Sequence, residues 1–262
     1  MKFHLNKCKV LFVTGRMTEP LSLISVLPFY NFAYSLGGTL LDYVHCEKDL
    51  GAMVTSSLDW KKQCSKVLSK ANQKLGMSRR NCHFVIDSNR RRVLYLTLVR
   101  SQFEHCSIIL RPVTKTQIST LEGLQKRAIK WILHEEYISY SPSIYIQKCN
   151  QLKIMPIADR FDFLDLVFFL KIVKGLVPVS LPAYIIPCQG HSRLRSSHLD
   201  SLSFVSTIIP RATTNAFARD FFFRANTKWN HVSFEVRDID SVTNHSNANS
   251  RLICWKKSSL GQ

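Results

Sequence analysis

The sequence predicts an α+β fold that is mainly α-helical, with short strands at the N-terminal end and an irregular C-terminal region. Short β-branched and apolar runs, bounded by Gly and charged residues, occur before residue 58. From residue 59 onward, apolar residues recur every three or four positions over long segments, which is the period of a helix. Hydrophobic residues make up 45% of the 262 residues, which is enough to form a core and excludes a wholly disordered chain.

Three short runs are expected to be the strands: Lys9–Thr14, Leu40–Val44 and Ala52–Thr55. The charged residues Glu47–Asp49, with Gly51 after them, are expected to form the turn before the last run. None of the runs is long enough for an independent sheet, so we expect strand edges that need a partner.

The first long helix is predicted from an Asp59 N-cap to about Arg80. Its inward face carries the apolar residues Trp60, Cys64, Val67, Leu68, Ala71 and Leu75. A stripe of lysines, each four residues from the next, lies away from that face: Lys62, Lys66, Lys70 and Lys74. Such a stripe usually only solvates an exposed helix. Because no acidic residue lies between Lys61 and Cys82, we interpret the stripe as a phosphate-binding face instead.

Two further basic helices are predicted. One runs from an Asp87 or Ser88 cap to about Leu110, before Pro112, and its first turn carries Arg90, Arg91 and Arg92. Cations there oppose the helix dipole, an arrangement that a bound phosphate would offset, although a solvated arginine cluster is the alternative. The next helix spans Thr116–His134 and directs Lys126, Arg127 and Lys130 outward.

A fourth long helix is predicted from Pro156, as its first residue, to Gly175, just beyond its end. Its aromatic and aliphatic stripe is interpreted as core and not as a base-stacking surface; it comprises Phe161, Leu164, Phe168, Ile172 and Val173. Asp162 and Asp165 share a face but lack a third carboxylate, so we expect an exposed polar edge and not a metal site.

The distribution of charge indicates the kind of partner. Lys and Arg total 36 against 18 Asp and Glu, a formal net charge of +18. Residues 61–130 hold 16 of these basic residues and only 3 acidic ones, a surplus of 13. A concentrated surplus of this kind is typical of a protein that binds a polyanion, either nucleic acid or an anionic membrane surface.

Several classes of protein are excluded by the remaining patterns. The eight cysteines include no Cys-x-x-Cys pair and follow no signal peptide, which predicts reduced thiols in a nuclear or cytoplasmic protein that is not secreted. The uncharged segment Pro20–Leu41 contains Pro28, Asn31 and Gly37-Gly38, which favours short strands or loops joined at a turn over a membrane helix. No metal-binding, nucleotide-binding or hydrolase motif occurs.

Short strings in a particular order run along residues 2–235. The first is Lys7-Cys8-Lys9-Val10-Leu11, followed by Lys48-Asp49-Leu50-Gly51 and Leu58-Asp59-Trp60. The later ones are Leu75-Gly76 with Arg79-Arg80, Leu98-Val99-Arg100 with Phe103-Glu104-His105, Leu121-Glu122 with Gln125–Ala128, Leu170–Val177, Leu181–Tyr184, Phe221–Arg224 and Trp229-Asn230. The ordered series resembles the C-terminal part of reverse transcriptases from jockey-like, non-LTR retrotransposons.

The resemblance implies a division of the chain. Residues 1–58 would be the end of the palm, with a primer-grip-like hairpin at Asp49, Leu50 and Gly51. Residues 59–135 would be a basic, thumb-like helical region, and residues 136–235 a helical and irregular C-terminal region. Residues 236–262 are expected to be a disordered tail, because they are rich in Asn and Ser.

The implied function is that of a fragment of an RNA-directed DNA polymerase that retains sequence-independent binding of an RNA or DNA template–primer. The family's paired catalytic aspartates would lie just upstream of residue 1. We therefore expect this chain alone to be inactive, with no catalytic residue and no cofactor of its own, since Mg²⁺ is implied only for the full-length enzyme. The expected backbone contacts are Lys62, Lys66, Lys70, Lys74, Arg79, Arg80, Arg90, Arg91, Arg92, Lys126 and Arg127.

Two alternatives to this interpretation remain. One is a non-enzymatic, basic helical scaffold or interaction protein derived from a decayed element. The other is an intact polymerase whose start lies further upstream, where an in-frame aspartate pair would be found. We expect no membrane partner on any of these interpretations.

Overall fold

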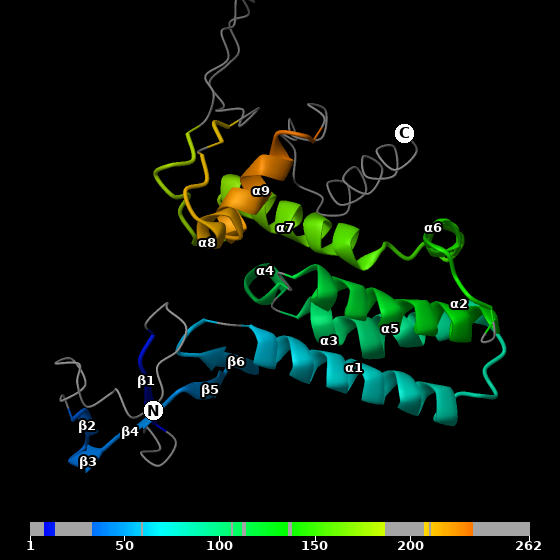
Figure 1. Ribbon diagram of the computed structural model, residues 1–262, viewed down its shortest axis with the longest axis horizontal. Coiled ribbons are helices and arrows are strands. Elements are labelled where there is room, and N and C mark those ends of the chain that lie inside the picture. The colour runs from blue at the N-terminus through cyan, green and yellow to red at the C-terminus, as the bar shows by residue number, and fades with distance from the viewer. Residues whose placement is uncertain are drawn as a thin grey trace, which may run out of the picture. The chain divides into compact units, whose positions relative to one another are not determined.

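The computed structural model describes residues 8–13, 33–58, 60–105, 107–111, 114–135, 138–186, 207–209 and 211–232 (Figure 1). The chain divides into two compact units. The first comprises Met1–Cys106 and Leu110–Gln117, and the second comprises Ser107–Ile109 and Ile118–Gln262. The described residues are mainly helical with a few short strands, as the sequence predicts.

The strands of the first unit pair two by two. Strand β1 (Lys9–Leu11) lies parallel to β4 (Asp42–Val44), whereas β2 (Ser35–Leu36) and β3 (Thr39–Leu40) form an antiparallel hairpin. A second antiparallel hairpin joins β5 (Cys46–Asp49) to β6 (Ala52–Thr55). The predicted strands are therefore present, although β1 and β4 are shorter than the runs that predicted them.

The turn of the β5–β6 hairpin differs from the expected one. Glu47–Asp49 were expected in the turn, but they lie in β5, and the turn consists of Leu50 and Gly51. Both turn residues have positive φ, 44° and 91°, which is the geometry of a two-residue type I′ hairpin turn. Glu47 is held in the strand by an ion pair with Lys9 of β1 at 3.0 Å.

Helix α1 (Lys61–Asn81) confirms the first predicted helix and packs against β6. The side chain of Gln63 is 5% exposed, and its Oε1 accepts a hydrogen bond of 2.9 Å from the backbone N–H of Met53. Further along the helix, Ala71, Leu75 and Ser78 are buried. The expected cap at Asp59 lies outside the described residues.

The second predicted helix is real but not continuous. Helix α2 (Ser88–Leu94) is capped by Asp87, leads into a π-helical segment, η4 (Tyr95–Arg100), and ends with α3 (Ser101–Glu104). His105 is extended, so the prediction of one helix to Leu110 is wrong. The break lets the short helix α4 (Ser107–Leu110) contribute to the second unit, where the Ile108 carbonyl accepts from Arg224 Nη2 at 3.3 Å.

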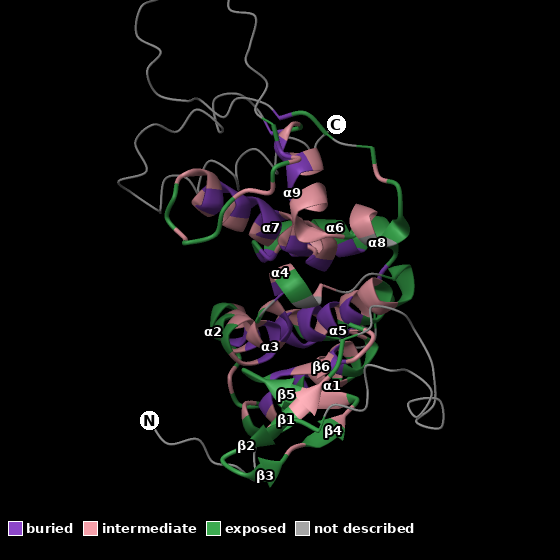
Figure 2. Cartoon of the chain, turned by 90° about the vertical axis from the view of Figure 1, so that its left-hand side faces the viewer, coloured by how far each residue is buried: buried purple, intermediate pink, exposed green. Residues whose placement is uncertain are grey.

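Besides its part of α4, the described part of the second unit contains three longer helices and two shorter ones: α5 (Lys115–Leu133), which begins in the first unit, α6 (Pro142–Gln151), α7 (Ile157–Val173), α8 (Asn215–Ala218) and α9 (Phe221–Trp229). Helix α6 was not predicted, although Ser141 followed by Pro142 is a start signal, and Ser141 accepts from the Ile144 N–H. Buried residues, purple in Figure 2, run along α5 and α7.

The core of this unit lies where α7 packs against α9. It comprises Phe163, Leu166, Phe169, Leu170, Ile185, Ala225, Trp229 and Val232. The interpretation of α7 as a core helix is confirmed, but its buried face differs from the predicted stripe. Phe161 and Ile172 are buried, whereas Phe168 is only half-buried and meets the ring of Phe221 edge-on at 5.5 Å.

Helices α5, α6 and α7 end in the same way. A residue with positive φ follows each helix, namely His134 (58°), Lys153 (52°) and Gly175 (66°). In each case that residue and the next donate backbone hydrogen bonds back into the last turn, as in a Schellman motif. Gly175 was predicted to end α7 in this way. Pro156 is the N-cap of α7 and not its first residue. The tail expected at residues 236–262 lies outside the described residues.

Candidate nucleic-acid interface

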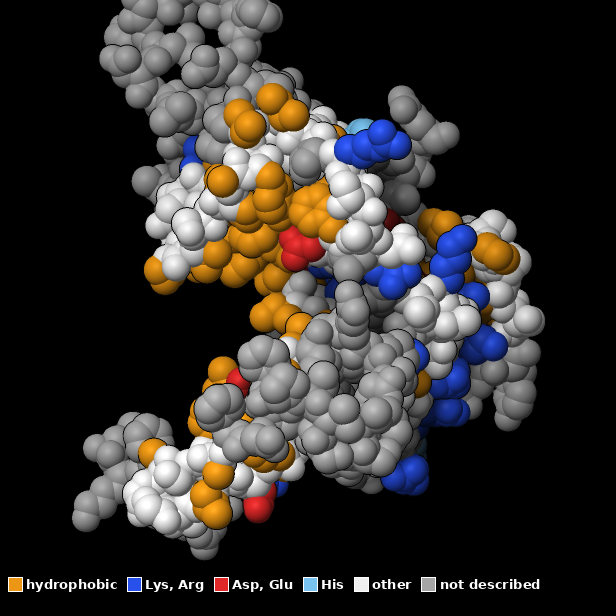
Figure 3. Space-filling model, turned by 60° about the vertical axis from the view of Figure 1, so that its left-hand side comes forward, with side chains coloured by type: hydrophobic (Ala, Val, Ile, Leu, Met, Phe, Trp, Pro, Cys, Tyr) orange, Lys and Arg blue, Asp and Glu red, His pale blue; other side chains and the backbone are white. Residues whose placement is uncertain are grey.

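The lysine stripe predicted on the first helix lies on the exposed side of α1. Lys62, Lys70 and Lys74 are exposed and Lys66 is half-buried, whereas Ala71 and Leu75 face the interior. Within the part of the chain that the structure describes, none of these four lysines forms an ion pair. On the face drawn in Figure 3, acidic side chains are scarce beside the Lys and Arg side chains.

This stripe, which we call the lysine face (Lys62, Lys66, Lys70 and Lys74), is unfavourable to the isolated helix. Like charges four residues apart destabilise a helix by about 0.2–0.5 kcal/mol per pair, so three successive pairs cost roughly 1 kcal/mol. No acidic residue in α1 offsets this repulsion. A bound polyanion would remove it.

Most of the arginines in the first unit that were predicted to contact phosphate are at least partly exposed. Arg79 and Arg80 are exposed in the last turn of α1, where a cation is favoured by the helix dipole. Arg90 is also exposed, with an 80% exposed side chain 3.6 Å from Asp87. Arg92 is half-buried.

Arg91 is the exception, and the expectation that it contacts phosphate needs correction. It is 5% exposed, and its guanidinium donates from Nε to the carbonyl of Val85 and from Nη2 to the carbonyl of His83. Its charge is thus used to hold the loop between α1 and α2. The arginines in the first turn of α2 were expected to oppose the helix dipole. The carboxylate of Asp87 offsets this effect, because it caps α2 and accepts a hydrogen bond of 2.9 Å from the Asn89 N–H.

Lys126 and Arg127 belong to the second unit, so we treat them separately from the lysine face. Arg127 is exposed, whereas Lys126 is half-buried with its Nζ 5.2 Å from the centre of the Tyr145 ring. Lys130 lies over Tyr140 in the same way, at 5.3 Å. These lysines therefore cover aromatic rings as well as carrying charge.

The primer-grip-like residues lie at the tip of the β5–β6 hairpin. Leu50 is 90% exposed in a left-handed conformation that is costly for a residue with a β-carbon. Asp49 and Gly51 are exposed beside it. The hydrogen bond from Met53 to Gln63 joins this hairpin to the start of α1, which carries the lysine face.

One surface was missed by the sequence reasoning: the loop from Cys82 to Asp87, between α1 and α2. Phe84 and Ile86 in this loop are 70% and 79% exposed. The available signal was the arginine cluster just after the loop, since a guanidinium has five N–H donors that can bind backbone carbonyls.

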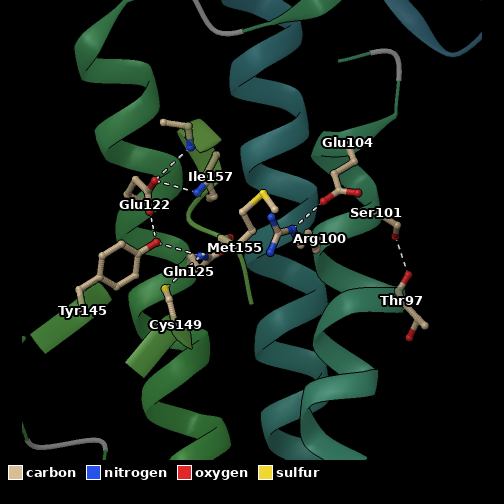
Figure 4. A network of polar contacts seen from close by, with 11 residues as sticks. Thr97, Arg100, Ser101, Glu104, Glu122, Gln125, Tyr145, Cys149, Met155 and Ile157 are labelled. Atoms are coloured by element: carbon tan, nitrogen blue, oxygen red, sulfur yellow. Dashed lines mark hydrogen bonds and ion pairs between the residues drawn. The ribbon is translucent and has the colours of Figure 1, made fainter. Parts of the chain in front are cut away.

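A polar network in the second unit was also missed (Figure 4). Glu122 of α5 accepts from Tyr145 of α6 and from the first two N–H groups of α7. Gln125 is completely buried and donates to the Tyr145 hydroxyl, to Cys149 and to the Met155 carbonyl. Burial, together with the charge of Glu122, raises the pKa of Tyr145. Separately, in the first unit, Arg100 pairs with Glu104 at 2.6 Å.

Asp162 and Asp165 do not form the exposed edge that was expected. Asp165 is 1% exposed and pairs with Arg224 at 3.3 Å, while Asp162 pairs with Lys228. Asp162 and Asp165 are three residues apart on α7, and their partners on α9 are four residues apart. Both pairs therefore form side by side between the two helices. Their role is structural.

No group of three or more metal-ligating side chains occurs among the described residues. Of the helices in the described ranges, none is long and apolar enough to cross a membrane. A scan of protein-family models, a search of curated proteins and a search of solved structures each find no match.

Proposed function

We propose that this chain binds the backbone of nucleic acid without sequence preference, as the template–primer-holding C-terminal part of a non-LTR retrotransposon reverse transcriptase. The ordered strings along residues 2–235 support the family, and the lysine face supports the activity. The single observation that carries the proposal is that face: four lysines without ion pairs among the described residues, on a helix that has no acidic residue.

The spacing of the lysine face suits a strand of phosphates. A helical rise of 1.5 Å places successive lysines about 6 Å apart along the axis and the outer two about 18 Å apart. A lysine ammonium is a flexible point charge, and a contact that it makes to a phosphate carries no sequence information. The ligand class is therefore the backbone of RNA or DNA.

Salt dependence of binding tests the proposal. Fluorescence anisotropy would measure the affinity of the full chain for a mixed-sequence duplex over a range of salt concentrations. Each phosphate neutralised on a duplex contributes about −0.9 to the slope of log K against log salt. Replacing all four lysines of the face by glutamine is expected to reduce the magnitude of the slope by about 3.6 and to weaken binding at low salt.

A matched control removes four positive charges elsewhere. Lys153, Lys171, Arg211 and Arg219 lie in the second unit and were not predicted to bind phosphate. Replacing them by glutamine changes the net charge equally but should leave most of the slope intact. Equal losses for the two variants, or binding that is independent of salt, would contradict the proposal. The scaffold alternative predicts no such binding.

A further inference from the structure

The loop between α1 and α2 presents an aromatic side chain in a fixed position. Phe84 is 70% exposed, although burial of a phenyl ring would be favourable. It is flanked by His83, whose ring is perpendicular to it at a centroid distance of 5.8 Å. The two rings are therefore not stacked face to face on each other.

Hydrogen bonds on both sides of Phe84 hold its backbone. Arg91 donates to the carbonyl of His83 before it and to the carbonyl of Val85 after it. The Val85 N–H closes a turn on the Cys82 carbonyl at 3.2 Å, and His83 Nδ1 lies 3.0 Å from the Arg80 carbonyl. Burying an arginine to position this loop gives the exposed ring a preorganised setting, which lowers the cost of binding a ligand.

The surroundings of Phe84 are basic. Arg80 lies four residues before it, at the end of α1, and Arg90 adjoins the arginine that holds the loop. Asp87 is the only acidic residue between Trp60 and Phe103, and it is already engaged with the Asn89 N–H and with Arg90. Charge complementarity thus favours an anionic ligand over an apolar face of another protein.

We propose that Phe84 is a stacking platform for an unpaired base, with the neighbouring Arg80 binding an adjacent phosphate. The inference rests on the proposed function and deepens it: the lysine face binds backbone of any form, whereas Phe84 adds affinity only where a base is free to stack. Single-stranded nucleic acid, or a duplex with a single-stranded extension, is the expected ligand. Aromatic rings that stack on bases, combined with cations that bind the backbone, are a common means of binding such ligands.

The test compares three probes with the full chain: a mixed-sequence single strand, a blunt duplex, and the same duplex with an extension that carries 2-aminopurine. Phe84→Ala is expected to weaken binding of the single strand about five- to 100-fold, the range for loss of one stacked base. It should change blunt-duplex affinity less than twofold. Wild-type protein should quench 2-aminopurine fluorescence, and the variant should not.

Two controls make the result specific. Phe84→Trp keeps a stacking surface and should retain single-strand affinity and quenching. Ile109→Ala removes a side chain that is 67% exposed in the second unit and should affect neither probe.

Either of two results would overturn the inference. Equal effects of Phe84→Ala on single strand and blunt duplex would show that Phe84 does not stack on bases. Unchanged oligonucleotide binding, with loss of self-association in sedimentation, would identify the loop as a protein-docking surface. If one of these results is found while the lysine-face variant still loses duplex binding, the role of Phe84 is wrong and the proposed function stands. If wild-type protein binds none of the probes, both proposals fail.

Discussion

Replacing Glu122 by alanine should destabilise the second unit strongly, because this one carboxylate connects three helices. Its Oε1 accepts from the N–H groups of Ile157 and Ala158 at 2.9 and 3.3 Å. These are the first amides of α7, whose N-cap, Pro156, supplies no side-chain acceptor. Its Oε2 accepts from the Tyr145 hydroxyl of α6.

The expected loss has two parts. Removing a side-chain acceptor from a helix N-terminus costs about 0.5–2 kcal/mol. Leaving the hydroxyl of Tyr145, a residue that is 6% exposed, without its acceptor costs about 1–3 kcal/mol more. We therefore expect Glu122→Ala to lower the free energy of unfolding by about 1.5–5 kcal/mol, with the larger values where water does not reach the vacated space.

Urea unfolding followed by tryptophan fluorescence measures this loss, because Trp131 and Trp229 are both buried in the second unit. Glu122→Gln keeps a carbonyl oxygen for the α7 amides and should cost less than half as much. Tyr145→Phe removes the hydroxyl but leaves the cap in place. The Glu122→Ala/Tyr145→Phe double variant should then be less destabilised than the sum of the single variants. Strict additivity, or a loss below about 0.5 kcal/mol for Glu122→Ala, would refute the reasoning.

Two further predictions concern stability. Leu50→Asn should raise the unfolding free energy of the first unit by up to about 1 kcal/mol, because asparagine tolerates the left-handed conformation that Leu50 adopts. Leu50→Ala, which removes the same exposed side chain but keeps the strain, should not stabilise in thermal unfolding; equal effects would contradict this explanation. The second concerns Glu135, whose pKa is lowered by hydrogen bonds from Lys148 and Tyr140. Its stabilisation should be complete above the ordinary Glu pKa of about 4.3 and should be lost as the pH falls through the lower folded-state value. In the Glu135→Gln variant, the urea midpoint should depend less on pH between about pH 3 and 5 than in the wild type. An equal dependence of the midpoint on pH in both proteins would contradict this assignment.

The ion pairs between α7 and α9 show that residues which carry the family resemblance also have a role in packing. Phe221–Arg224 and Trp229-Asn230 carry part of the resemblance, and in the structure they lie in or beside the core of the second unit. Trp229 is 1% exposed, and Arg224 pairs with the buried Asp165. These strings thus have a packing role that is independent of any ligand.

The sequence alone determined the features that depend on local pattern. The three- and four-residue period located α1, α5 and α7, and Gly175 was predicted as a helix end. Of the two caps that the sequence offered for α2, Asp87 and Ser88, the structure has Asp87. The lysine face followed from the same period, because residues four apart share one side of a helix. The three predicted β-branched runs coincide with β1, β4 and β6 within a few residues, whereas β5 was expected to be a turn.

Tertiary structure decided which charged residues are available at the surface. Three adjacent arginines look alike in sequence, but Arg90 is exposed, Arg92 is half-buried, and Arg91 is buried with its guanidinium on the carbonyls of His83 and Val85. Asp165 is buried and pairs with Arg224 of α9. The two residues are 59 positions apart, a separation that no local period encodes. Likewise, the helix that was predicted to continue to Leu110 is interrupted at His105, and Ser107–Ile109 belong to the second unit. Periodicity fixes the side of a helix on which a residue lies, whereas only the fold brings distant donors and acceptors together.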